Sequence, residues 1–204
     1  MNVTTQPLCI ANGAADAPFH PVAFVNWSEY PYKPEVSVRL DLADDAFCID
    51  YRVSEQAVLA RYDQDGDRVW TDSCVECFIR PADSDVYYNI ECSCIGTLLI
   101  ARGNSREGRE PLPADVLSTV ERTASLGRQP FGLLNQPTSW TLSLRIPFAV
   151  FGDDARMFCA DSLRFNVYKC GDDLPTPHFV SLFPIPIQEP NFHRPDFFGT
   201  LKLR

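Results

Sequence analysis

The sequence predicts an all-β fold, an antiparallel β-sandwich of jelly-roll or immunoglobulin-like two-sheet architecture with few short helices. Three observations support this prediction. Apolar and polar residues alternate with a period of two in several short segments, which is typical of half-buried strands. Turn-forming residues are frequent, with 17 prolines and 10 glycines among 204 residues. Helical periodicity is sparse, so we expect short strands joined by turns along the whole chain.

The strands are expected in the following order. In residues 36–42, Val36, Val38 and Leu40 share one face and polar residues take the other. This strand and residues 46–53 flank the turn "ADD", which predicts a hairpin. Further strands are expected at residues 76–81, 86–101, 138–151, 163–171 and 197–204.

Three segments do not read as strands alone. Residues 113–124 fit either a short helix or a strand, and residues 103–113 form the longest polar loop. Residues 174–199 contain too many prolines for a central strand, so we expect a structured loop lying over the surface of the fold. Trp140 is in phase with Leu142 on its strand, and we expect it to pack in the core, as we do Trp27.

The overall charge narrows the classes of partner. Asp and Glu outnumber Lys and Arg by 27 to 18, which gives a net charge of −9. Phosphate backbones and anionic membranes attract proteins of the opposite sign, so we expect neither a nucleic acid nor a membrane as partner. No signal peptide is visible at the start of the sequence. This predicts a cytoplasmic protein unless a leader was removed.

The eight cysteines are expected to be free thiols that pack as small apolar side chains, because most lie inside apolar runs. Two pairs resemble zinc-ligand spacing. Cys74 and Cys77 are three residues apart on a predicted strand and therefore point to opposite faces. Cys92 and Cys94 share a face, but they are in phase with apolar residues. A zinc site is disfavoured, and the sequence identifies no metal ligands.

A polar row runs along one predicted hairpin. In the strand beginning at residue 86, Asn89 and Glu91 alternate with apolar residues, and Glu76 lies in the partner strand. If the strands pair, these three side chains converge on the face turned away from the core, with Trp70 at the edge. One interpretation is a solvated sheet face, which is common in antiparallel proteins. The other is a saccharide site, because carboxylates and amides bind hydroxyl groups and an indole stacks on a sugar ring.

Six segments of the sequence, taken together and in their order along the chain, resemble the carbohydrate-binding module family 9-like domains. This group includes the sugar-binding modules of xylanases. The segments are "VWTDSCVECFI", "YYNIECSCIGTLL", "WTLSLRIPF", "RFNVYKCGDD", "PHFVSLFPI" and "PNFHRPDFFGTLKL". The resemblance covers residues 21–204, which we expect to form a single domain after an N-terminal segment, residues 1–20.

The resemblance implies a set of site residues. Trp70 matches the first of two aromatic residues that sandwich a saccharide, and Phe192 lies near the second. Glu76 matches a ligand-binding glutamate, and His193 and Arg194 lie beside Phe192. Asn89 and Glu91 lie on the strand that supplies an arginine and an asparagine in the xylanase modules, so the polar contacts differ. The resemblance implies no certain cofactor, although those modules carry structural calcium.

Three functions remain open from the sequence. The first is a non-catalytic domain that binds a neutral mono- or oligosaccharide and takes part in the catabolism of plant-type or complex glycans. The second is a small glycoside hydrolase that uses Glu76 and Glu91, because such enzymes need two carboxyl groups on either side of the scissile bond. The third is a structural or partner-binding sandwich that has lost sugar binding, since a fold does not fix a function.

Overall fold

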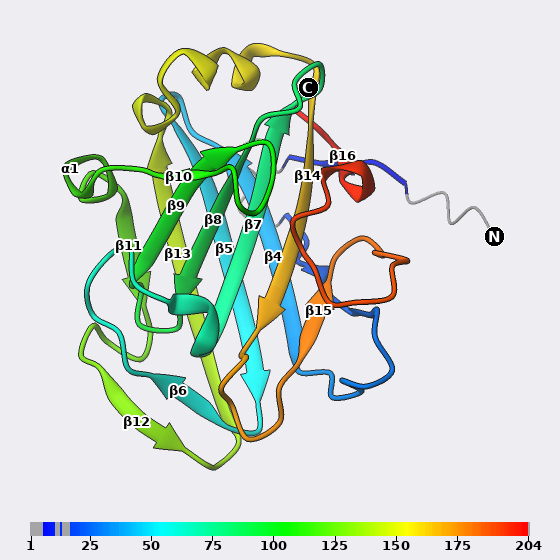
Figure 1. Ribbon diagram of the computed structural model, residues 1–204. Coiled ribbons are helices and arrows are strands. Elements are labelled where there is room, and N and C mark those ends of the chain that lie inside the picture. The colour runs from blue at the N-terminus through cyan, green and yellow to red at the C-terminus, as the bar shows by residue number, and fades with distance from the viewer. Residues whose placement is uncertain (1–5, 11–12, 14–16, 204) are drawn as a thin grey trace.

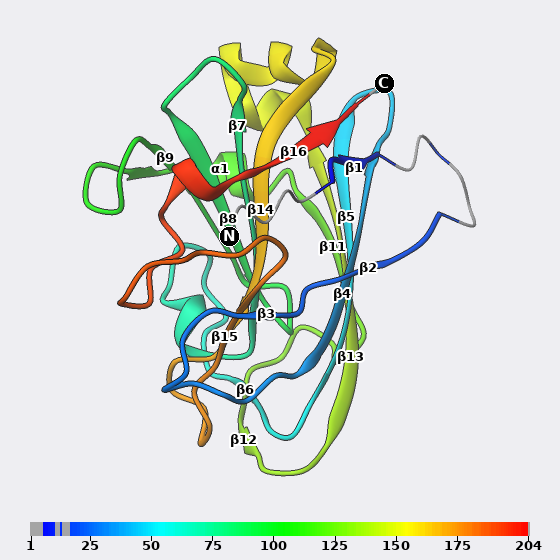
Figure 2. The same ribbon diagram turned by 90° about the vertical axis from the view of Figure 1, so that its right-hand side faces the viewer.

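Two sheets packed face to face make up most of the computed structural model (Figure 1), which describes residues 6–10, 13 and 17–203. The strands of the first sheet are, in spatial order, β1 (Leu8–Cys9), β16 (Gly199–Lys202), β14 (Ser162–Cys170), β7 (Cys74–Pro81), β8 (Tyr87–Ser93), β9 (Leu98–Gly103) and β10 (Glu110–Pro111), with β15 (Phe179–Ser181) beside β14 and β3 (Phe24–Val25) beside β15. The strands of the second sheet are β11 (Glu121–Ala124), β13 (Thr138–Pro147), β5 (Ala46–Glu55), β4 (Glu35–Leu42) and β2 (His20–Pro21). Seen side-on, the sheets form two layers (Figure 2), which confirms the predicted β-sandwich.

The remaining elements are short. β12 (Phe131–Leu134) and β6 (Val58–Ala60) form a separate antiparallel pair. The helices are α1 (Ala114–Leu117) and the 3₁₀ segments η1 (Val69–Thr71), η2 (Phe148–Cys159) and η3 (Pro195–Phe197). Among the described residues, no helix has the length and apolar character needed to cross a bilayer.

The core between the sheets follows from the alternation along the strands. Val38 and Leu40 of β4 and Leu142 and Leu144 of β13 are all buried, and they pack in one cluster with the inward residues of the first sheet. Polar residues between them remain partly or fully exposed on the outer face of the second sheet. Trp140 packs in this core as predicted, with 2% of its surface exposed.

The structure differs from the sequence prediction in three segments. Residues 86–101 form two strands, β8 and β9, because the chain turns at Gly96, whose φ of 83° favours glycine. Residues 113–124 contain both a helical turn, α1, and a strand, β11. In residues 138–151 the strand, β13, ends at Pro147, and the 3₁₀ segment η2 begins at the next residue.

A second apolar cluster lies on the outer face of the first sheet. Tyr168 of β14 and Phe78 of β7 are fully buried there, beneath Ile185 and Phe192 of the proline-rich segment 174–199. The Trp27 indole, also buried, donates a hydrogen bond to the carbonyl oxygen of Ile187 at 3.0 Å. The proline-rich segment therefore lies over the outer face of the first sheet, as predicted, and forms a second apolar core with it.

A buried ion pair joins the two sheets. Lys169 of β14 lies 2.9 Å from a carboxylate oxygen of Glu55 of β5, and neither side chain is exposed. Trp140 donates its indole N–H to the other oxygen of Glu55 at 2.8 Å. Lys169 also donates to His178 Nε2 at 2.9 Å, and burial, followed by the charge of Lys169, lowers the pKa of His178 to about 3. His178 is therefore neutral and accepts the bond.

Candidate functional site

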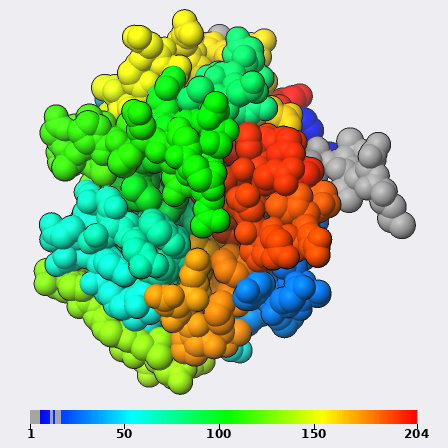
Figure 3. All heavy atoms as spheres, in the orientation of Figure 1, coloured from blue at the N-terminus to red at the C-terminus, as the bar shows by residue number. Residues whose placement is uncertain are grey.

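A pocket opens on the outer face of the first sheet, where the loop before β10 meets the segment that leads to η3. In Figure 3 these two segments, green and red-orange, lie next to each other on the face shown. The cavity between the side chains has a volume of about 110 Å³, smaller than the roughly 300–1,000 Å³ of pockets that enclose a drug-sized ligand, and it opens to solvent at its mouth. Its lining residues come from six parts of the chain and are Trp70, Glu76, Glu91, Arg106, Arg109, Cys170, Asp172, Phe179, Pro190, Asn191, Phe192 and His193.

Five of the seven site residues predicted from the sequence line this pocket. They are Trp70, Glu76, Glu91, Phe192 and His193. Trp70 lies in η1, a 3₁₀ turn that ends just before β7, and its side chain is only partly buried. Segments that are more than 100 residues apart in the sequence therefore contribute to one site.

Two carboxyl groups form the floor. Glu76 of β7 and Glu91 of β8 are direct partners in the antiparallel register, and both point to the outer face. They are 3% and 2% exposed, because the pocket walls and the proline-rich segment cover them. The face is the one predicted, but the interpretation of a solvated sheet face is wrong at these two positions.

This burial changes the acidity of both groups. Burial raises the pKa of Glu76 well above its usual range, and the facing Glu91 raises it further. Burial also raises the pKa of Glu91 to about 7, although Arg109 and a hydrogen bond from Asn89 act in the opposite direction. Like charges this close do not both ionise readily. The pair therefore keeps at least one proton near neutral pH and presents both a hydrogen-bond donor and an acceptor.

One wall is built by Arg109 and His193. Arg109 donates to His193 Nε2 at 2.9 Å, and the Nδ1 atom lies 2.8 Å from the Tyr87 hydroxyl. Because a guanidinium only donates, Nε2 accepts and Nδ1 carries the proton. Burial, followed by the charges of Arg109 and Arg106, lowers the pKa of His193 to about 3, so the imidazole is neutral.

The loop that carries Arg106 and Arg109 depends on a glycine at its start. A Cβ atom at Gly103 would lie 2.5 Å from the backbone of both Arg109 and Gly108. Only a residue without a side chain allows the loop to fold back this closely. The close approach at Gly103 thus places the two arginines over the floor.

The aromatic walls are unequal. The Phe192 ring stacks on Tyr168, with centroids 4.2 Å apart and planes inclined by 10°, so one of its faces is already used. Phe192 is 9% exposed. Phe179 lines the same side of the site and meets Phe192 edge-on at 6.1 Å. The half-buried Trp70 indole is the other aromatic surface at the pocket.

The other two predicted residues lie outside the lining. Asn89 is fully buried behind the floor and donates to Glu91 Oε1 at 2.8 Å, so it supports the floor. Arg194 forms an ion pair with Asp196 at 2.6 Å, and its guanidinium lies 4.9 Å from the centre of the Phe197 ring. Arg194 therefore does not contribute to the pocket.

Several lining residues were not predicted from the sequence. Arg106 and Arg109 lie in a segment that shows no periodicity, and nothing in it indicates which way the loop folds. Cys170 is the last residue of β14, and Asp172 follows shortly after it. Both lie in the segment "RFNVYKCGDD", whose thiol and carboxyl groups could have marked them as candidates. Burial, followed by the charge of Asp173, raises the pKa of Asp172 to about 6.

The cysteines behave largely as expected. All eight are free thiols. Cys74 and Cys77 point to opposite faces of β7, and Cys92 and Cys94 pack in the core between the sheets. Among the described residues, the one group of three or more His, Cys, Asp or Glu side chains with converging ligand atoms is Cys74, Glu76 and Cys170. Its two thiols do not suit calcium, which takes oxygen ligands.

Comparison with solved structures shows which proteins have this fold. One similar structure is a 2.70 Å crystal structure of a protein from Bacteroides uniformis ATCC 8492 that is provisionally described as carbohydrate-binding. It shares 42% sequence identity with this chain at a TM-score of 0.83, and the match covers 91% of this chain and 85% of that chain. A carbohydrate-binding module family 9 from Caldicellulosiruptor kristjanssonii in complex with glucose has 13% identity and a TM-score of 0.57, covering 98% and 96%. The same kind of module in complex with cellotriose has 13% identity and a TM-score of 0.50, covering 97% and 93%.

Comparison of sequences gives the family. No curated protein matches this chain. The family model described as "Carbohydrate-binding family 9" matches residues 7–203, which is nearly the whole sequence. The chain belongs to carbohydrate-binding family 9.

Proposed function

We propose that this carbohydrate-binding domain holds a neutral mono- or oligosaccharide in the pocket between Trp70 and Phe192 and performs no chemistry on it. The observation that carries the proposal is the buried pair Glu76 and Glu91 at the floor of a pocket with aromatic walls. A sugar ring has hydroxyl groups around its rim and C–H groups on its faces. The floor offers partners for the hydroxyl groups and the indole offers a flat apolar surface for the C–H groups.

The charges around the pocket support a neutral ligand. The charged lining residues are Arg106 and Arg109, which are basic, and Glu76, Glu91 and Asp172, which are acidic. Because the buried pair retains a proton near neutral pH, the positive and negative charges nearly balance. The related modules were solved with glucose and with cellotriose, which makes these two neutral saccharides the first ligands to test. Binding of such ligands suits a role in glycan catabolism.

A hydrolase needs an acid and a second carboxylate on either side of the scissile bond. Glu76 and Glu91 are cross-strand partners on one floor, so a saccharide lying on that floor has both carboxyl groups on the same side. This arrangement favours binding over hydrolysis. A chromogenic glycoside turned over by the wild-type protein and not by the Glu76→Gln variant would favour the hydrolase instead.

The test is a titration of the protein with glucose and with cellotriose, in which binding is measured by calorimetry and by tryptophan fluorescence. We expect Trp70→Ala to weaken binding by roughly 2- to 10-fold, if stacking of a sugar on the indole is worth about as much as an aromatic pair, about 0.5–1.5 kcal/mol. The matched control is Phe24→Ala, an exposed aromatic residue outside the pocket, and it should leave binding unchanged. Equal affinities for wild type and Trp70→Ala would contradict the proposal.

A further inference from the structure

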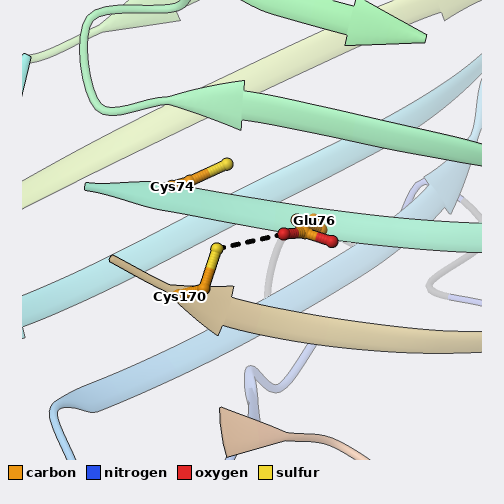
Figure 4. Close-up of side chains that lie close together, drawn as sticks. All are labelled: Cys74, Glu76 and Cys170. Atoms are coloured by element: carbon orange, nitrogen blue, oxygen red, sulfur yellow. Dashed lines mark hydrogen bonds between the residues drawn. The ribbon is translucent and has the colours of Figure 1, made fainter. Parts of the chain in front are cut away.

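Two thiols and a carboxylate converge at the floor of the pocket. Cys74 and Glu76 lie two residues apart on β7, so their side chains leave the same face of the sheet. Cys170 ends β14 and is the register partner of Cys74. One ligand atom from each residue lies within 4.8 Å of the other two, and all three residues are buried. Figure 4 shows the Cys170 sulfur next to the carboxylate of Glu76, to which it donates a hydrogen bond at 3.0 Å.

The surroundings of this cluster are rich in acids. Glu91 faces Glu76 from the neighbouring strand, and its Oε2 atom is buried without a hydrogen-bond partner among the described residues. Within the same residues, no lysine or arginine forms an ion pair with Glu76 or Glu91. Ionising two buried acids side by side is costly unless a counter-charge lies close by. A cation bound at the cluster would supply that counter-charge.

We propose that Cys74, Cys170 and Glu76 form a binding site for a divalent transition-metal ion of the zinc class, with its fourth coordination position open to the pocket. Sulfur ligands select such ions over calcium or magnesium. A tetrahedral zinc ion with bonds of about 2.0–2.3 Å holds its ligand atoms about 3.3–3.8 Å apart. The cluster spans 3.0 Å from Cys170 to Glu76 and at most 4.8 Å overall, which brackets that spacing.

The site has an access path and a defined proton balance. Glu76 and Cys170 line the pocket, so an ion reaches them from solvent without opening the fold. Thiolate and carboxylate ligands bind a metal in their deprotonated form, so binding displaces the protons of Cys74 and Cys170, and any proton on Glu76, and affinity should rise with pH. Cys77, on the opposite face of β7, cannot take part.

The experiment uses the reduced full chain with the exposed Cys9 and Cys159 replaced by serine, so that only half-buried and buried thiols remain. Cadmium is the probe, because its bond to thiolate gives an ultraviolet charge-transfer band, and zinc binding is followed by competition with a chromogenic chelator. We expect one ion per chain, release of protons on binding, and an affinity that rises with pH.

Cys170→Ser should weaken cadmium binding by more than about 10-fold, because loss of a direct ligand costs at least as much as loss of a residue that only supports one. The matched control is Cys77→Ala, a buried thiol on the same strand and the opposite face, which should leave stoichiometry and affinity unchanged. Absence of a thiolate–cadmium band in the parent protein at one equivalent would overturn the proposal, even if a variant fails to fold. Equal affinity in Cys170→Ser would overturn it as well.

Discussion

The buried pair Glu76 and Glu91 makes a quantitative prediction for stability. Burial raises the pKa of Glu91 from 4.5 to about 7 in the folded protein. Between these two values the unfolded chain has lost this proton while the folded protein keeps it. The free energy of unfolding therefore falls as pH rises from about 4.5 to about 7. At about 1.4 kcal/mol per pKa unit, Glu91 alone accounts for a loss of about 3 kcal/mol.

The perturbation that tests this effect is Glu91→Gln, which keeps the shape of the side chain and removes its charge, including the effect of that charge on Glu76. Urea unfolding of wild type and variant should be measured between pH 4 and pH 9. We expect the stability of the variant, relative to wild type, to increase by about 3 kcal/mol across that range. Glu35→Gln, at an exposed position of β4, is the control and should show no such trend. Parallel curves for wild type and Glu91→Gln would refute the reasoning.

Two further predictions concern other charged side chains. Lys169→Met leaves Glu55 without its cation, and breaking a buried ion pair costs about 3–5 kcal/mol. Urea unfolding at pH 7 should show this loss of stability. A decrease of less than about 1 kcal/mol in the free energy of unfolding would contradict this assignment. Arg109→Met removes a positive charge beside His193, so the pKa of that imidazole should rise above its value of about 3; an unchanged midpoint in an NMR titration of the histidine would show that Arg109 does not act on it.

The strands and their faces were predictable because they depend on local alternation. Residues 36–42 and 46–53 show their buried positions directly, and β4 and β5 follow them closely. The same alternation placed Glu76, Asn89 and Glu91 on one face. It could not show that this face is buried, because the cover comes from residues 174–199, and no periodic pattern links that segment to β7 and β8.

The walls of the pocket were less predictable for a related reason. Trp70 was expected at the edge of the polar row and also matched a family position, whereas Phe192 was found only through the resemblance of its flanking segment to a family. Arg109 reaches the pocket only because the loop folds back at Gly103, a contact between backbone atoms that the sequence does not encode as a pattern. The direction of Arg194 likewise depends on its neighbour Asp196, which holds the guanidinium away from the site.

The most direct measurement is a crystal structure of the protein soaked with cellotriose and, separately, with glucose. Our account predicts one sugar ring against the indole of Trp70 and beside Phe192, with its hydroxyl groups within hydrogen-bond distance of Glu76 and Glu91. A saccharide bound on another surface, with this pocket holding only water in crystals where its mouth is open, would contradict the account.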